Sequence, residues 1–325
     1  MADAAADGWL VEQGIGEERA LCYRDGNVMA ARLRWPDGLE PGAVVEGLLV
    51  SRTRGSTRGH AVFPNGEEAL VDKLPRDASE GARMRFAVTR AAIGEAHRIK
   101  LAQVRPTQEP ERPAPALTAI LPGARTIFAF AHGDWEDISD LAFEGTVSFS
   151  GGSLHFAPTP AMVMVDVDGH LPPRDLALAA VEPLARAIAL LGMGGIIGID
   201  FPTLEAKADR KAVDIALEAA LADFDHERTA MNGFGFVQIV ARFERPSILH
   251  LFQHDRAGAA VRLLLRRAET LTGPGRIELA AHPAVMARLS EDWLGKLRQR
   301  TGKELSMRPD ATLALDAPHA QLTPR

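Results

Sequence analysis

The chain contains the stretch Ala161-Met-Val-Met-Val-Asp-Val-Asp-Gly169 and, further along, Gly194-Gly-Ile-Ile-Gly-Ile-Asp-Phe201. The apolar runs 161–165 and 195–199 predict two strands buried on both faces, and the pattern of 174–191 predicts a helix between them. A strand–helix–strand unit makes its two strands parallel, almost always with a right-handed crossover. We therefore expect Asp166 and Asp200 at the same carboxyl edge of one sheet, where open α/β sheets bind their ligands.

Paired carboxylates at such an edge favour a cation, because two buried negative charges repel each other unless an ion lies between them. Oxygen ligands without histidine or cysteine suit Mg²⁺, or else Mn²⁺, which can activate water beside a phosphodiester. The alternative is that each aspartate only caps the turn that follows its strand.

The sequence around these strands predicts a mixed α+β chain. A hairpin over 145–156, a helix over 204–224 and a strand over 235–240 complete a central α/β, nuclease-like domain, 119–250. Five short strands within 43–105 favour an OB-type barrel, after an N-terminal β segment, 1–42. Residues 106–118 hold four prolines and are typical of a linker. Residues 257–318 predict a small C-terminal α/β domain.

Composition limits the kind of protein. The formal net charge of −6 argues against coating nucleic acid by bulk charge, although Arg76–Arg112 is locally basic. The single cysteine, Cys22, excludes a disulfide within one chain and a multi-cysteine zinc site. Met1–Gly8 lacks the pattern of a secretory signal, and the most apolar stretch is too short to span a bilayer. We expect a cytoplasmic protein without a membrane segment.

At its central motifs the sequence resembles the ribonuclease E/G family. Five stretches are similar to sequence motifs of that family: Ser150-Gly-Gly-Ser-Leu154, Val165-Asp-Val-Asp168, Gly194–Phe201, Asp225-His-Glu-Arg228 and Gly233-Phe-Gly-Phe-Val237. The match is carried by about 145–248. Weaker similarity extends to the barrel, through Phe86-Ala-Val-Thr-Arg90 and Ile99-Lys-Leu101, and to 257–316.

The resemblance implies cleavage of single-stranded RNA that leaves a 5′-phosphate, with Asp166 and Asp200 as Mg²⁺ ligands. Asp168 replaces the family's asparagine and is a further candidate ligand. For RNA binding, Phe63 is either a stacking aromatic or a core residue. Arg54, Arg58 and Lys100 either hold phosphates or line solvated loops. Arg228 either clamps the scissile phosphate or lies at the surface.

The chain also departs from the family. With only Cys22, the family's Cys-Pro-x-Cys zinc link is missing, so any homo-oligomer would not be linked by zinc. The segment before the hairpin is short, so we expect no 5′-phosphate sensor. Two hypotheses remain open: a metal-dependent endoribonuclease, and a non-catalytic RNA-binding paralogue that keeps the scaffold.

Overall fold

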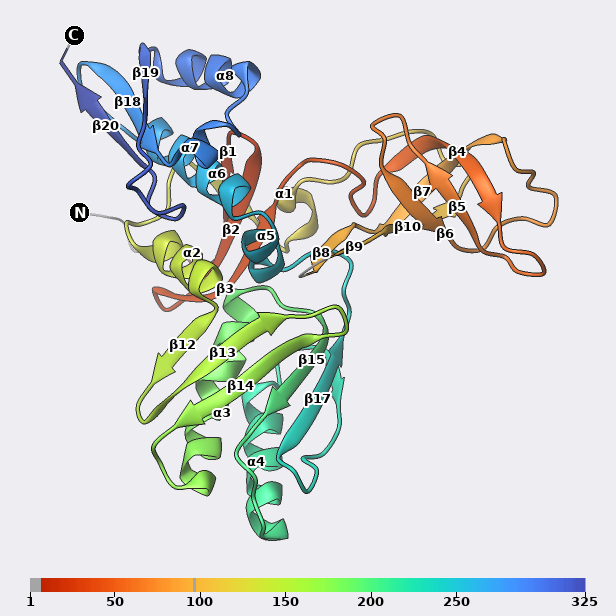
Figure 1. Ribbon diagram of the computed structural model, residues 1–325, viewed down its shortest axis with the longest axis vertical. Coiled ribbons are helices and arrows are strands. Elements are labelled where there is room, and N and C mark those ends of the chain that lie inside the picture. Colours follow the sequence, from red (N-terminus) through yellow and green to blue (C-terminus); the bar gives the residue numbers. More distant parts are fainter. Residues whose placement is uncertain (1–6, 96–97, 325) are drawn as a thin grey trace.

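The computed structural model describes residues 7–95 and 98–324 and shows a mixed α and β protein. A small barrel projects from a larger body (Figure 1). The two parts have separate hydrophobic cores, and the core of the body combines residues from Leu10 to Leu33 with residues from Trp135 to Leu297. The first strands therefore pack with the body and not with the barrel that follows them in sequence.

The N-terminal strands form a sheet in the order β11-β1-β2-β3. Asp25 and Gly26 join β2 to β3, and both have positive φ angles of 51° and 74°. An Asp-Gly pair with two positive φ angles is typical of a two-residue hairpin turn. The strands are β1 (Gly8–Gly14), β2 (Glu17–Arg24), β3 (Asn27–Arg34) and β11 (Arg125–Ile127).

The barrel closes in the order β10-β6-β5-β4-β7, with β6 and β10 parallel. This is consistent with the predicted OB-type fold. Its strands are β4 (Val44–Arg52), β5 (Gly59–Val62), β6 (Glu68–Val71), β7 (Arg83–Arg90) and β10 (Ala102–Pro106). Ile99 and Lys100 lie outside the barrel strands, because they belong to a separate hairpin of β8 (Ile93–Glu95) and β9 (Arg98–Lys100).

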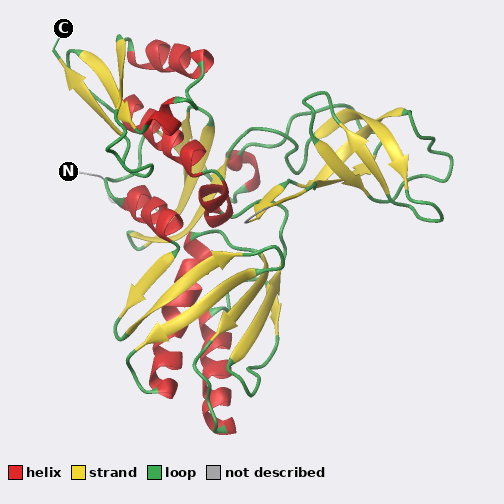
Figure 2. Cartoon of the chain, viewed as in Figure 1, coloured by secondary structure: helices red, strands yellow, loops and turns green. Residues whose placement is uncertain are grey.

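The central sheet has the order β12-β13-β14-β15-β17-β16. Helices α3 and α4 lie on one side of it, and the other side is uncovered in Figures 1 and 2. Together with β11, the elements of this part of the chain are α1 (Leu117–Ile120), α2 (Asp134–Glu144), β12 (Thr146–Phe149), β13 (Gly152–Pro158), β14 (Val163–Gly169), α3 (Pro173–Leu190), β15 (Gly195–Asp200), α4 (Lys207–Ala220), β16 (His226–Arg228) and β17 (Phe236–Ala241).

Two sequence expectations about this sheet were wrong. Strands β14 and β15 are buried on one face only, because Met164 is half-buried and Ile196 is 37% exposed. The helix expected over 204–224 spans only Lys207–Ala220. Residues 221–224 lie in the turn before β16, which pairs with β17 at the edge of the sheet.

From α6 onward, the C-terminal part runs in the order helix, strand, helix, strand, strand, with α7 as an added helical turn, and it is the mixed α/β unit expected for 257–318. Its sheet has the order β19-β18-β20. The elements are α5 (Ile248–His254), α6 (Arg256–Glu269), β18 (Arg276–Ala281), α7 (Pro283–Met286), α8 (Glu291–Thr301), β19 (Leu305–Pro309) and β20 (His319–Thr323).

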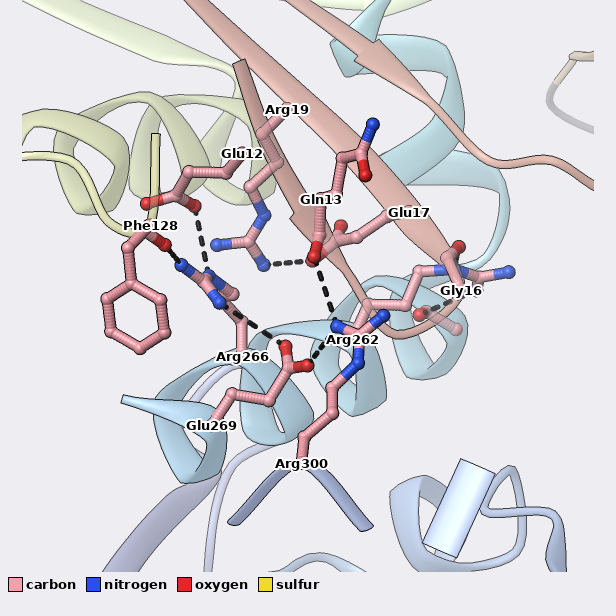
Figure 3. A network of polar contacts seen from close by, with 11 residues as sticks. Glu12, Gln13, Gly16, Glu17, Arg19, Phe128, Arg262, Arg266, Glu269 and Arg300 are labelled. Carbon is pink, nitrogen blue, oxygen red and sulfur yellow. Dashed lines mark hydrogen bonds and ion pairs between the residues drawn. The ribbon is translucent and has the colours of Figure 1, made fainter. Parts of the chain in front are cut away.

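A buried ionic network joins the beginning of the chain to its C-terminal part (Figure 3). The Nε of Arg266 on α6 donates to Glu12 on β1 at 3.1 Å, and the same guanidinium pairs with Glu269. Arg300 on α8 pairs with Glu269 as well. Glu12, Arg266 and Glu269 are each less than 9% exposed, so removing one partner would leave a buried charge uncompensated.

Within the described residues, none of the helices combines the length and the apolar character needed to cross a membrane.

Candidate functional site: two aspartates on an open sheet face

The two predicted aspartates lie side by side. Strands β14 and β15 are parallel, and Asp166 is the direct partner of Asp200 in their register. Neighbouring strands are about 4.8 Å apart, and paired residues point to the same face. The expected parallel pair at one sheet edge is therefore confirmed.

Alternation along the strands decides which way the carboxylates point. Val163, Val165 and Val167 are buried in the core of the body, whose other members include residues of α3 and α4. Asp166 and Asp168 lie between them and must face the opposite, uncovered side. Both are exposed, as is Asp200. The aspartates are thus not buried charges, and water can reach the space between them.

The donor set fits a hydrated magnesium ion. No group of three or more histidine, cysteine, aspartate or glutamate side chains is placed to hold a metal ion within residues 7–95 and 98–324. Mg²⁺ usually keeps several waters and takes only one or two protein carboxylates, so Asp166 and Asp200 suffice. Asp168 lies two residues further along β14, and its Oδ1 accepts a hydrogen bond from the Gly169 backbone N–H at 2.8 Å.

A row of side chains crosses the open face at the level of the aspartates. The successive partners are Thr146, His155, Asp166, Asp200 and Phe236, one from each of five strands. His155 is exposed, and its ring nitrogens lie 2.9 Å from Ser153 Oγ and 3.3 Å from Thr146 Oγ1.

Sequence reasoning missed His155. The alternation of Leu154, His155 and Phe156 already places the histidine opposite the core. Only the register of β13 with β14 brings it beside Asp166.

The barrel residues occupy two different loops. Arg54 and Arg58 lie between β4 and β5, and Lys100 lies on the hairpin between β7 and β10. These correspond to the two loops with which OB folds bind oligonucleotides. Arg58 is 77% exposed and lies 3.4 Å from Asp72.

Phe63 needs a correction. Its side chain is only 3% exposed and packs edge-on against Phe86 in the barrel core, with ring centroids 5.7 Å apart. The ring presents no face to solvent, so the core alternative describes it and the stacking alternative does not.

Arg228 also differs from its predicted role as a phosphate clamp. It pairs with Ile239 of β17, which is buried against the helices, so its side chain leaves the sheet on the face opposite the aspartates. Its guanidinium bonds the Asp214 carboxylate at 3.1 Å and the Asp214 carbonyl at 2.7 Å. Arg228 ties β16 to α4.

The site is an open surface and not a pocket. A cavity of about 400 Å³ lies at the other edge of the same sheet, between Gly192–Gly194 and Arg242–Ile248. That edge holds the beginning of β15 and the end of β17, far from Asp166 and Asp200 along both strands. An open face suits an extended polymer better than a small molecule, which needs an enclosing cleft.

The segment that carries the aspartates also matches known proteins. The family model of the ribonuclease E/G family matches residues 125–242, which include β12–β17 and the whole aspartate edge. This segment of the chain is similar to the ribonuclease E/G family. Within this ribonuclease E/G segment lie Asp166, Asp168, Asp200 and His155.

Curated proteins that are similar to this chain include ribonucleases G. Ribonuclease G of Escherichia coli strain K12 is 32% identical over 151 residues, covering 42% of this chain and 31% of its own length. Ribonuclease G of Salmonella typhimurium strain SL1344 is 31% identical over 151 residues, with the same coverage. The aligned part of the chain spans about a third of the length of those relatives.

Proposed function

We propose that this chain is a metal-dependent endoribonuclease that cuts single-stranded RNA and leaves a 5′-phosphate. The observation that supports it most directly is the paired register of Asp166 and Asp200 on an open face, inside the segment that matches the ribonuclease E/G family. Relatives of this chain are ribonucleases G, which makes RNA the polymer of choice for that face.

Each residue has its own role in the proposed cleavage. Asp166 and Asp200 would hold Mg²⁺, or Mn²⁺, with their carboxylates. When bound, such an ion lowers the pKa of water and neutralises charge on a phosphodiester. Asp168 orients water at the next position of β14. His155, beside Asp166 on the same face, moves a proton during cleavage. Arg54, Arg58 and Lys100 hold phosphates of the strand at the barrel.

Purified protein and a 5′-labelled single-stranded RNA test the proposal, with Mg²⁺ and with a chelator. We expect cleavage only with the ion. Asp166→Asn and Asp200→Asn should each lower the rate at least about 100-fold, because the ion is no longer held. Asp168→Asn should cost no more than about tenfold. RNA affinity should hold or rise, since a negative charge beside a phosphate is removed.

Asp292→Asn is the matched control, because Asp292 lies on α8 with a side chain 66% exposed and pairs with the neighbouring Lys296 at the surface. Product ends are checked by digestion with an exonuclease that requires a 5′-phosphate. If the wild-type protein binds RNA but does not cut it with any divalent ion, the endoribonuclease proposal is wrong and the non-catalytic RNA-binding paralogue is supported. The engagement of Arg228 with Asp214 is the observation that favours that second reading.

A further inference from the structure

The uncovered sheet face carries apolar side chains directly beside the aspartates. Phe236 is the partner of Asp200 in the β15–β17 register, so its ring stands on the same face. The ring leans over Gly198, where a Cβ atom would come within 2.7 Å of it. The sulfur atoms of Met162 and Met164 lie over the same glycine, at 2.6 Å and 3.2 Å from that position. Glycine at 198 thus makes room for an aromatic ring laid along the sheet.

A second phenylalanine, Phe234, lies in the turn that precedes β17. Phe234 is 80% exposed, the highest value among the exposed large hydrophobic residues. The turn that carries it is rigid, because the Asn232 Oδ1 accepts hydrogen bonds from the backbone N–H groups of both Phe234 and Phe236. Gly235 follows with a φ of +90° and packs on the Phe201 carbonyl, which leaves no room for a side chain.

The turn lies next to the aspartate edge. The Phe201 backbone N–H donates to the Gly235 carbonyl at 3.2 Å, and Phe201 directly follows Asp200. An exposed ring on a rigid turn loses little conformational entropy when a flat ligand packs on it. Phe234 and Phe236 therefore lie two residues apart, in and directly after a rigid turn, next to the place where the proposed cleavage would occur.

We propose that Phe234 and Phe236, flanked by Met162 and Met164, form a stacking subsite for an unpaired nucleobase next to the phosphate held at Asp166 and Asp200. This proposal rests on the proposed function. The three aspartates repel a phosphate that approaches without a cation, whereas a nucleobase is neutral and flat. Base stacking on aromatic side chains tolerates any sequence. It also requires a base whose faces are free, which gives the site a preference for single strands.

The test measures the affinity of short fluorescent RNA oligomers in the presence of a chelator, so that no cleavage occurs. Phe234→Ala should weaken binding about 5- to 100-fold, the range of one stacked base. Phe128→Ala is the matched control, because Phe128 is also a 70% exposed phenylalanine but lies after β11, away from the central sheet. Phe236→Leu keeps an apolar side chain over Gly198 and should weaken binding as well.

An abasic nucleotide, moved one position at a time along the oligomer, identifies the stacked base. At one position the abasic nucleotide should weaken binding to the wild type as much as Phe234→Ala does. The Phe234→Ala variant should bind that abasic oligomer no more weakly than it binds the intact oligomer. The subsite proposal is wrong if Phe234→Ala and Phe236→Leu both bind the RNA with wild-type affinity. It is also wrong if, at every abasic position, the loss of affinity caused by the abasic nucleotide adds fully to the loss caused by Phe234→Ala. Failure of the proposed function can be distinguished from failure of the subsite, because the wild type would then bind RNA but show no Mg²⁺-dependent cleavage.

Discussion

At the scale of single residues, alternation along a strand decides what a side chain can do. The valines of β14 face the core and its aspartates face solvent, so Asp166 can meet a hydrated ion without the cost of burying a charge. Arg228 shows the opposite case. Its type suits a phosphate, but its place on β16 turns it toward the helices and Asp214.

Buried His250 on α5 predicts a dependence of stability on pH. Burial lowers the pKa of His250 to about 4, helped by Lys100 and opposed by Glu95. The unfolded chain binds a proton near pH 6.5, so this stabilisation is present above pH 6.5 and is lost as pH falls toward 4. The loss reaches about 3 kcal/mol in the free energy of unfolding.

Thermal unfolding between pH 7 and pH 4.5 measures this effect. His250→Asn should show a smaller fall in Tm over that range than the wild type, because the buried titrating group is gone. Exposed His132→Asn is the control and should follow the wild type. An unchanged pH profile in His250→Asn would mean that other groups cause the loss.

At the scale of elements, pairs of secondary structures are joined by contacts that a sequence pattern does not display. Arg228→Ala should lower the free energy of unfolding by about 1–3 kcal/mol, because Asp214 and its carbonyl lose their donor. RNA affinity and cleavage should stay near wild type. Chemical denaturation and the cleavage assay measure the two effects, and a selective loss of cleavage in a stable variant would restore the phosphate clamp.

The sequence allowed the parallel aspartate pair to be predicted, because a helix between two apolar strands leaves few topologies. It also indicated the five barrel strands through their alternation and turns. Three features could not be predicted. The burial of Phe63 depends on packing against Phe86, and the orientation of Arg228 depends on the register of β16 with β17. The position of His155 depends on the register of β13 with β14, which alternation alone does not fix.

At the scale of the whole molecule, the barrel and the body have separate cores. We expect two unfolding transitions in calorimetry. Phe86→Ala removes a fully buried ring from the barrel and should lower only one transition, by about 3–5 kcal/mol. Leu264→Ala, at an equally buried site on α6, should lower only the other. A single transition that moves with both variants would contradict the separation.

The network of Glu12, Arg266, Glu269 and Arg300 has a consequence for synthesis on the ribosome. Strands β1 and β2 are made before the barrel, yet Glu12 of β1 pairs with Arg266 of α6, whose network includes Glu269 and, on α8, Arg300. Trp293 of α8 also covers Gly16 between these strands. The barrel emerges next with all its strands and can fold while translation continues. Strands β1 to β3 can pair with one another early, but the ionic network that fixes β1 to the body is complete only after α8 has left the exit tunnel. The body therefore completes its folding after the barrel, although its first strands are made before the barrel.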